Sequence, residues 1–180
     1  MVLITALMLT VALPAAGLHF GAGTGTAAQL VSVSDQTSLV VPFTGEARLG
    51  VWFGPWRMYM GGGGSLGAEA MHFHRFSRLT SISSWSVLAG GGFDTGELFS
   101  LDLRGGLTGY KVGKGGRTEV MSAFVSAVPE IMISVKGEKD ARWCIGFPVT
   151  VSFGETVTGV SVGISGGISW GGKNVQEDVR

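Results

Sequence analysis

Eight ionisable residues of this 180-residue chain stand in segments where apolar and polar residues alternate, and each takes a polar position. Four are arginines and four are acids: Glu46, Arg48, Arg57, Glu69, Asp102, Arg104, Glu130 and Arg142. Residues two apart in an extended strand point to one face, so these groups would share a face of a sheet. Enclosed together they must pair, because an unpartnered buried ion costs several kcal/mol. If the sheet closes into a ring with these residues inside, the pattern predicts a charge network in its lumen that acts as a structural plug. The alternative is a gate or a polar binding site within the lumen.

Two histidines and a serine offer a second kind of chemistry. His72 and His74 would lie on one face of an extended segment, where they could hold a metal ion with a third ligand. No such ligand is close in sequence, and Arg75 would oppose a cation. Ser77 beside His74 could serve a lipid-modifying enzyme, although a serine and a histidine three residues apart are common by chance. We therefore expect a non-enzymatic protein with no metal and no cofactor, and place this segment at the rim of a sheet.

Three further features are given structural interpretations. The run Gly61 to Gly64 lacks the lysine and hydroxyl residue of a phosphate loop, and instead indicates close backbone approach within a strand. The single Cys144 excludes an internal disulfide and is interpreted as a small residue on a packed face. The segment from Leu30 to Thr44 is apolar and is the longest candidate for an external loop. It could extend a first hairpin or form an apolar mouth.

A period of two in the apolar and polar residues of the sequence predicts the strands that position these side chains. Strict alternation between apolar and polar residues indicates a strand with one apolar face, and each run has about the 9–11 residues that a tilted strand needs to cross a bilayer. No later segment is apolar for long enough to form a membrane-spanning helix. The predicted strands cover Leu18 to Ala27, Thr44 to Phe53 with a possible start near Leu39, Arg57 to Glu69, Ser81 to Gly91, Leu98 to Tyr110, Glu119 to Val135, Ala141 to Phe153 and Val160 to Trp170.

The apolar faces of these strands have the properties of a lipid-facing surface. No charged residue occupies them in seven of the eight strands, and a mid-depth Arg or Lys facing lipid would cost about 2–4 kcal/mol. The fourth strand has no clearly apolar face. Aromatic rings favour the headgroup level of a membrane. If the first strand starts at the periplasm and successive strands alternate in direction, the predicted membrane-interface aromatics lie at the periplasmic strand ends: Phe20, Phe53, Trp56, Phe99, Trp143 and Trp170.

Composition and the termini complete the organisation. Apolar residues make up 45% of the chain and charged residues only 14%, against roughly 25% in ordinary soluble domains. Thirteen basic residues balance thirteen acidic ones, so no overall field would attract nucleic acid. Residues 1–17 have the apolar character of a signal peptide, with Ala15 and Gly17 as small residues before the cleavage point. The predicted barrel domain is 18–170, and 171–180 form a polar C-terminal tail.

An even number of amphipathic strands points to a closed ring, because a sheet within lipid must pair every backbone group. With its signal peptide, regular turns and last strand ending in Trp170, the chain resembles the small eight-stranded bacterial outer-membrane β-barrel superfamily of the OmpA transmembrane domain, OmpX and OmpW. The resemblance implies an all-β fold, an eight-stranded antiparallel up-and-down transmembrane β-barrel. It also implies the outer membrane of a diderm bacterium, with outer-membrane lipid and the barrel-assembly machinery as partners.

Function is less constrained than fold, because one fold carries many functions. The favoured hypothesis is a non-enzymatic structural or surface-interaction protein with a largely closed polar lumen. An OmpW-like narrow passage for small apolar molecules is the first alternative, and a lipid-modifying rim enzyme is a further one. A secreted, lipocalin-like ligand binder shows the same alternation, with its apolar face turned inward instead of outward.

Overall fold

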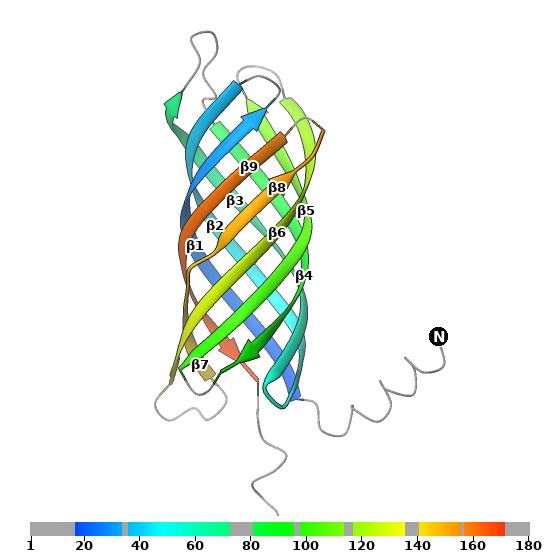
Figure 1. The fold of residues 1–180 in the computed structure, drawn as a ribbon, viewed down its shortest axis with the longest axis vertical. Coiled ribbons are helices and arrows are strands. Elements are labelled where there is room, and N and C mark those ends of the chain that lie inside the picture. Colours follow the sequence, from blue (N-terminus) through cyan, green and yellow to red (C-terminus); the bar gives the residue numbers. More distant parts are fainter. Residues whose placement is uncertain are drawn as a thin grey trace, which may run out of the picture.

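The computed structural model describes residues 17–33, 36–72, 81–95, 98–113, 117–135, 141–155 and 157–171. Within these ranges no helix is long and apolar enough to cross a membrane. The described residues are almost all in strands, and the strands wind around a single axis (Figure 1). The predicted signal peptide falls almost entirely outside the described residues, and its last residue, Gly17, is the first residue of strand β1.

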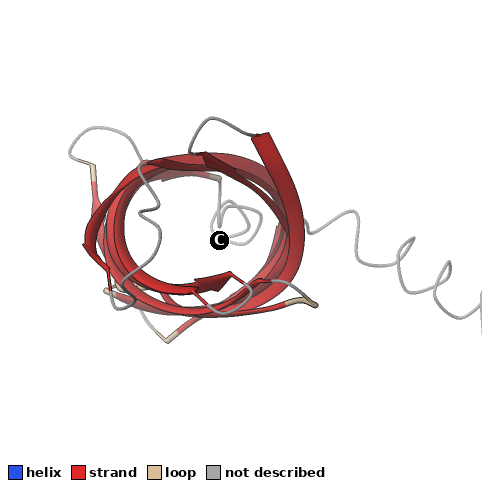
Figure 2. Ribbon diagram, turned by 90° about the horizontal axis from the view of Figure 1, so that it is seen from above, coloured by secondary structure: helices blue, strands red, loops and turns tan. Residues whose placement is uncertain are grey.

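The strands form one closed antiparallel ring. In chain order they are β1 (Gly17–Val33), β2 (Gln36–Phe53), β3 (Trp56–His72), β4 (Ser81–Asp94), β5 (Phe99–Gly113), β6 (Arg117–Ser134), β7 (Ala141–Gly146), β8 (Val149–Phe153) and β9 (Val157–Trp170). Successive strands pair from β1 to β7, β7 and β8 each pair with both β6 and β9, and β1 pairs with β9 to close the sheet. Viewed along its axis, the sheet is a complete ring (Figure 2). The end where β1 starts and β9 stops is called the terminal end below, and the opposite end the hairpin end.

Segments β7 and β8 occupy one position in the ring, so the barrel has eight strand positions, as predicted. Both pair with β6 in one unbroken register, since Glu130 faces Gly146 and Ala127 faces Val149. The interruption falls at Phe147 and Pro148, opposite Pro129, and a proline has no N–H to donate to the ladder. Phe147 still donates to the Pro129 carbonyl at 2.9 Å. The predicted single strand from Ala141 to Phe153 is therefore divided by its proline.

The apolar face of the barrel points outward. Exposed side chains such as Leu103, Val125 and Ile164 alternate with buried polar ones such as Asp102 and Arg104. This arrangement contradicts the lipocalin-like alternative, in which the apolar residues would fill the centre. Strand β4 has the same outward face, since Trp85 and Val87 are exposed, although its inward position Leu88 is apolar. Its apolar face is hard to recognise in the sequence because small residues separate its few large ones.

Two local expectations need correction. The segment Leu30 to Thr44 is not a loop, because β1 continues to Val33 and β2 starts at Gln36, with residue pairs such as Leu30 and Leu39 in register. The apolar residues there extend the first hairpin. Strand β5 also runs to Gly113, beyond its predicted end, and so includes Lys111. Among the charged residues whose side chains the structure describes, Lys111 alone takes an outward strand position, close to the hairpin end.

Candidate functional site

A cluster of ionised side chains crosses the interior of the barrel in its terminal half. It is called the luminal charge network and consists of Glu46 and Arg48 from β2, Arg57 from β3, Asp94 from β4, Asp102 and Arg104 from β5, Glu130 from β6 and Arg142 from β7. Each residue stands at an inward position of its strand, because the period of two turns alternate side chains to the lumen. The network thus links walls on opposite sides of the ring.

Asp102 is the centre of the network. Its carboxylate has no exposed surface and accepts hydrogen bonds from Arg57 Nε at 2.8 Å and Arg48 Nη1 at 2.9 Å. The Tyr59 hydroxyl donates a further bond of 2.9 Å. Arg57 is itself 1% exposed, and its Nη2 contacts both Asp102 and Glu130. Hydrogen bonds to ionised groups are stronger than neutral ones, so these buried contacts fix the side chains of four strands, β2, β3, β5 and β6, against one another.

Arg104 and Glu46 form the edge of the network nearest the hairpin end. Arg104 Nη1 donates to both oxygens of Glu46, at 3.0 and 2.9 Å, and its Nη2 lies 3.4 Å from Glu130 Oε1. Glu46 also lies 3.0 Å from Arg48 Nε. A carboxylate held between two guanidinium groups bridges β2 and β5 across the lumen.

Arg142 and Asp94 join the network on its terminal side. Arg142 Nη1 donates to Asp94 Oδ2 at 3.4 Å, and Asp94 Oδ1 lies 3.8 Å from Arg57 Nη1. The sequence places Asp94 in a turn, whereas the structure makes it the last residue of β4 and a buried member of the network. Its inward position follows the parity of Gly90 and Gly92, so continuing the alternation of β4 by three residues would have predicted it.

The opposite charges of the network are equal in number. Its four arginines face four carboxylates, and every carboxylate lies within 4 Å of an arginine nitrogen. Equal numbers of positive and negative groups lower the electrostatic cost of enclosing so many ions, since each ion is taken from water together with a partner of opposite charge.

Glycines provide the space that the network needs. Gly92 on β4 faces the lumen, and a Cβ atom there would overlap Asp102 Oδ1 and Arg57 Nε. Gly90 lies beneath Tyr59, where a Cβ would be 2.9 Å from the hydroxyl oxygen. Both positions therefore require the absence of a side chain for a steric reason, as expected where a bulky group crosses a strand.

A polar and aromatic layer closes the terminal side of the network. Trp52 Nε1 donates to His19 Nδ1 at 3.0 Å, the two rings stand edge to face with centroids 5.3 Å apart, and Ser169 Oγ lies 3.4 Å from the same histidine nitrogen. The Trp52 ring also packs against Arg57, whose Cζ lies 5.4 Å from the ring centroid. The sequence places His19 on the polar face but assigns it no role, and no spacing motif links it to Trp52.

Several other predicted site residues lie beyond what the structure describes. Glu69 belongs to β3 and His72 ends it, but their side chains are outside the described set, as are His74 and Ser77 altogether. The described residues contain no group of three metal-ligating side chains. Cys144 is buried on β7 and faces the lumen, with its Sγ 3.8 Å from the Arg142 carbonyl oxygen.

The predicted interface aromatics all lie near the terminal end of the barrel. Trp56, Phe99, Trp143, Phe20 and Trp170 are exposed, and Phe53 is partly so. Two close ring pairs occur there: Phe20 packs on Trp170 with centroids 5.5 Å apart, and Trp56 packs on Phe93 at 4.6 Å. The aromatics come from strands all around the ring, including β1, β3, β5, β7 and β9, so they form a belt.

Proteins of similar fold among solved structures include two outer-membrane proteins. Neisserial surface protein A (NspA) aligns with a TM-score of 0.61 and 16% identity over 85% of this chain and 96% of that chain. Ail, the attachment invasion locus protein of Yersinia pestis, solved with the heparin analogue sucrose octasulfate, aligns with a TM-score of 0.54 and 14% identity over 85% of this chain and 99% of that chain. No family model and no curated protein matches the sequence. Both neighbours are small eight-stranded outer-membrane β-barrels, which confirms the predicted fold.

Proposed function

We propose that this chain, which has the fold of the small eight-stranded outer-membrane β-barrels, spans the outer membrane of a diderm bacterium as a non-enzymatic protein with a closed lumen. Its role is structural or in surface interactions: the barrel holds the connections at its hairpin end outside the cell. Outer-membrane lipid surrounds it, and the barrel-assembly machinery inserts it. The terminal end, with its aromatic belt, faces the periplasm.

The outer surface supports this location. Runs such as Trp143 to Phe153 and Val160 to Trp170 present large apolar side chains outward over about the length that a tilted strand needs to cross the hydrocarbon layer. The belt of Trp and Phe at one end matches the preference of these rings for the headgroup level. A soluble protein rarely exposes continuous apolar surface on this scale.

The observation that carries the functional part of the proposal is the luminal charge network. Arg57 and Asp102 are almost fully buried in the middle of the ring, and their partners come from β2, β4, β5 and β6. Opening a pore there would require several of these ion pairs to separate. Ionised side chains in the lumen also present an unfavourable surface to the small apolar molecules that an OmpW-like passage would carry.

The closed lumen predicts the result of a conductance measurement. Purified protein inserted into planar bilayers is expected to give no steady single-channel currents, because an ion could pass the terminal half only if the paired arginines and carboxylates moved apart. A channel-forming barrel inserted in the same bilayer preparation serves as the positive control. Regular current steps that scale with the amount of inserted protein would contradict the closed lumen and favour a passage.

The membrane location predicts how the outer surface responds to charge. Leu107→Arg, at mid-strand on β5, is expected to lower the free energy of unfolding by about 2–4 kcal/mol in lipid vesicles, because the guanidinium would face hydrocarbon. Leu18→Arg is the matched control, since Leu18 is equally outward but lies at the terminal end, where the cost falls to about 0–1 kcal/mol. Urea unfolding measures both. Equal losses at the two positions would argue against a bilayer around the barrel.

A further inference from the structure

The lumen contains a cavity that the luminal charge network does not fill. It lies on the hairpin side of the network, with a volume of about 170 Å³. An apolar cavity of roughly 150 Å³ is large enough to hold benzene, so this space can hold a molecule of similar size. Unlike such a cavity, this one has many serine and threonine residues in its lining beside apolar ones, and it is called the hydroxyl chamber below.

The walls of the hydroxyl chamber offer hydrogen bonds from several strands. The lining includes Ser65 on β3, Ser84 and Ser86 on β4, Thr108 on β5, Ser126 on β6 and Thr150 on β8. Some of these hydroxyls bond to each other: Ser65 and Ser84 are 2.7 Å apart, and Thr150 donates to Ser126 at 2.9 Å. A hydroxyl has one donor and two acceptor sites, so even the paired ones can bind a further partner.

The floor of the chamber carries charge that is already compensated. Arg104 and Glu46 both line it, and their side chains are hydrogen-bonded to each other. Arg104 Nε is nevertheless buried without an acceptor among the described residues. A buried donor without a partner costs about 1–3 kcal/mol, so this nitrogen adds to the cost of enclosing Arg104 and does not itself reach into the chamber. A ligand of either net charge would disturb the balance of the ion pair.

Carbon surfaces complete the lining. Leu88 and Phe124 contact each other on the wall, and Tyr110 lies towards the hairpin end, where its hydroxyl accepts a hydrogen bond of 3.2 Å from Gln29 Nε2. The combination of hydroxyl groups with a few apolar patches suits a ligand that carries both hydroxyls and C–H groups. A small polyol has this chemistry.

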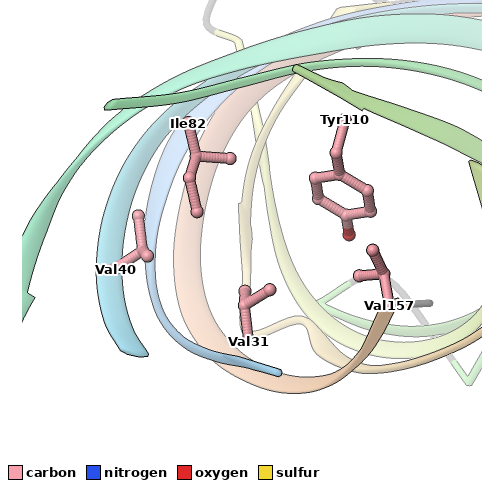
Figure 3. Packing of buried hydrophobic residues seen from close by; sticks show 5 residues of the cluster. All are labelled: Val31, Val40, Ile82, Tyr110 and Val157. Carbon is pink, nitrogen blue, oxygen red and sulfur yellow. The ribbon is translucent and has the colours of Figure 1, made fainter. Parts of the chain in front are cut away.

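An apolar cluster separates the chamber from the hairpin end of the barrel. It is called the outer cluster and consists of Val31, Val40, Ile82, Tyr110 and Val157, which come from the hairpin ends of β1, β2, β4, β5 and β9. Figure 3 shows these side chains pointing into the lumen from different sides of the ring. The apolar side chains of the outer cluster can move apart without breaking an ion pair, whereas opening the floor of the chamber would require the Arg104–Glu46 ion pair to separate. The outer cluster is therefore the side from which a ligand would enter.

We propose that the hydroxyl chamber is a binding site for one small uncharged polyol, which enters from the hairpin end past the outer cluster. The site lies above a plug that stays closed, so it holds its ligand without passing it through the barrel. It depends on the barrel fold and on the luminal charge network, and it does not depend on the membrane location.

A thiol placed in the chamber tests this site, with glycerol as the probe. In a Cys144→Ser background, Ser86→Cys reports on the chamber and Glu155→Cys reports on an exposed turn. Glycerol is expected to slow the reaction of Ser86→Cys with neutral methyl methanethiosulfonate, and to leave Glu155→Cys unchanged. Sodium glycerate, a charged analogue of similar size, is expected not to protect. Equal slowing at both positions, or equal protection by glycerate, overturns the proposal.

The route of entry is tested in the same assay. Ile82→Ala removes part of the outer cluster and is expected to raise the reaction rate of Ser86→Cys by about tenfold, with Glu155→Cys again unchanged. An unchanged rate would show that the outer cluster does not control access. Heat-modifiable migration on a denaturing gel establishes that each variant is folded, and Thr108→Cys replaces Ser86→Cys if that variant does not fold.

A measurement without a new thiol gives an independent result. Ligand-observed saturation-transfer NMR on the unmodified protein is expected to show glycerol signals that Ser126→Leu abolishes, because the leucine side chain would fill the chamber. Steady single-channel currents in the conductance measurement described above, together with retained glycerol binding, would count against the closed plug alone. Persistence of the glycerol signals in Ser126→Leu would overturn the chamber as the binding site.

Discussion

Asp102→Ala is expected to lower the free energy of unfolding by about 3–5 kcal/mol, the usual cost of leaving a buried charge without its partner. The carboxylate accepts hydrogen bonds from Arg48, Arg57 and Tyr59, and it is completely enclosed. Its removal would leave two guanidinium groups in the lumen with one carboxylate fewer. Urea unfolding in detergent micelles or lipid vesicles, followed by tryptophan fluorescence, measures the loss.

Two further variants make this result specific. Asp102→Asn keeps the shape of the side chain and removes only its charge, so a loss close to that of Asp102→Ala would assign the effect to electrostatics rather than to a cavity. Glu155→Ala removes an exposed carboxylate in a turn and is expected to change the stability by no more than about 0.5 kcal/mol. A loss below about 1 kcal/mol for Asp102→Ala would contradict the central role of this residue.

The fold follows from the sequence because lipid and ring closure impose a strict pattern. Outward positions must be apolar, and a one-residue slip would expose every inward charge, so strands such as β5 and β9 are evident from alternation alone. The pattern weakens where the constraint weakens. At the hairpin end, inward residues such as Val31 and Val40 are apolar like their outward neighbours, and the alternation that identifies a strand is lost.

The composition of the charge network follows from the same alternation, but its contacts do not. Side chains of Arg57 and Asp102 are 45 residues apart in sequence and meet because of strand order and stagger, which the pattern of one strand does not contain. Asp94 was missed because Asp is also a common turn residue, and the turn that follows it begins one residue later. Tyr59 shares the inward parity of Arg57, but the sequence does not indicate that its hydroxyl contacts Asp102.

Glycine positions are the least predictable part of the site and also the most sensitive to change. Gly92→Val is expected to lower the free energy of unfolding by at least about 3 kcal/mol, because its Cβ would overlap Asp102 Oδ1 and Arg57 Nε and would force this buried pair apart. Neither atom is the free end of a flexible chain, since both are held by hydrogen bonds. Urea unfolding and heat-modifiable migration on a denaturing gel measure the loss of stability and of folded protein.

Two outward glycines provide matched controls. A Cβ at Gly45 or at Gly166 would meet no atom within 4 Å, and neither backbone has a positive φ angle. Gly45→Ala and Gly166→Ala are therefore expected to leave stability unchanged or to raise it by up to about 1 kcal/mol, through the reduced freedom of the unfolded chain. If Gly92→Val were as mild as these two, the space at Gly92 would not be needed by the ion pair. If all three were severe, the strands would require glycine for their backbone rather than for the network.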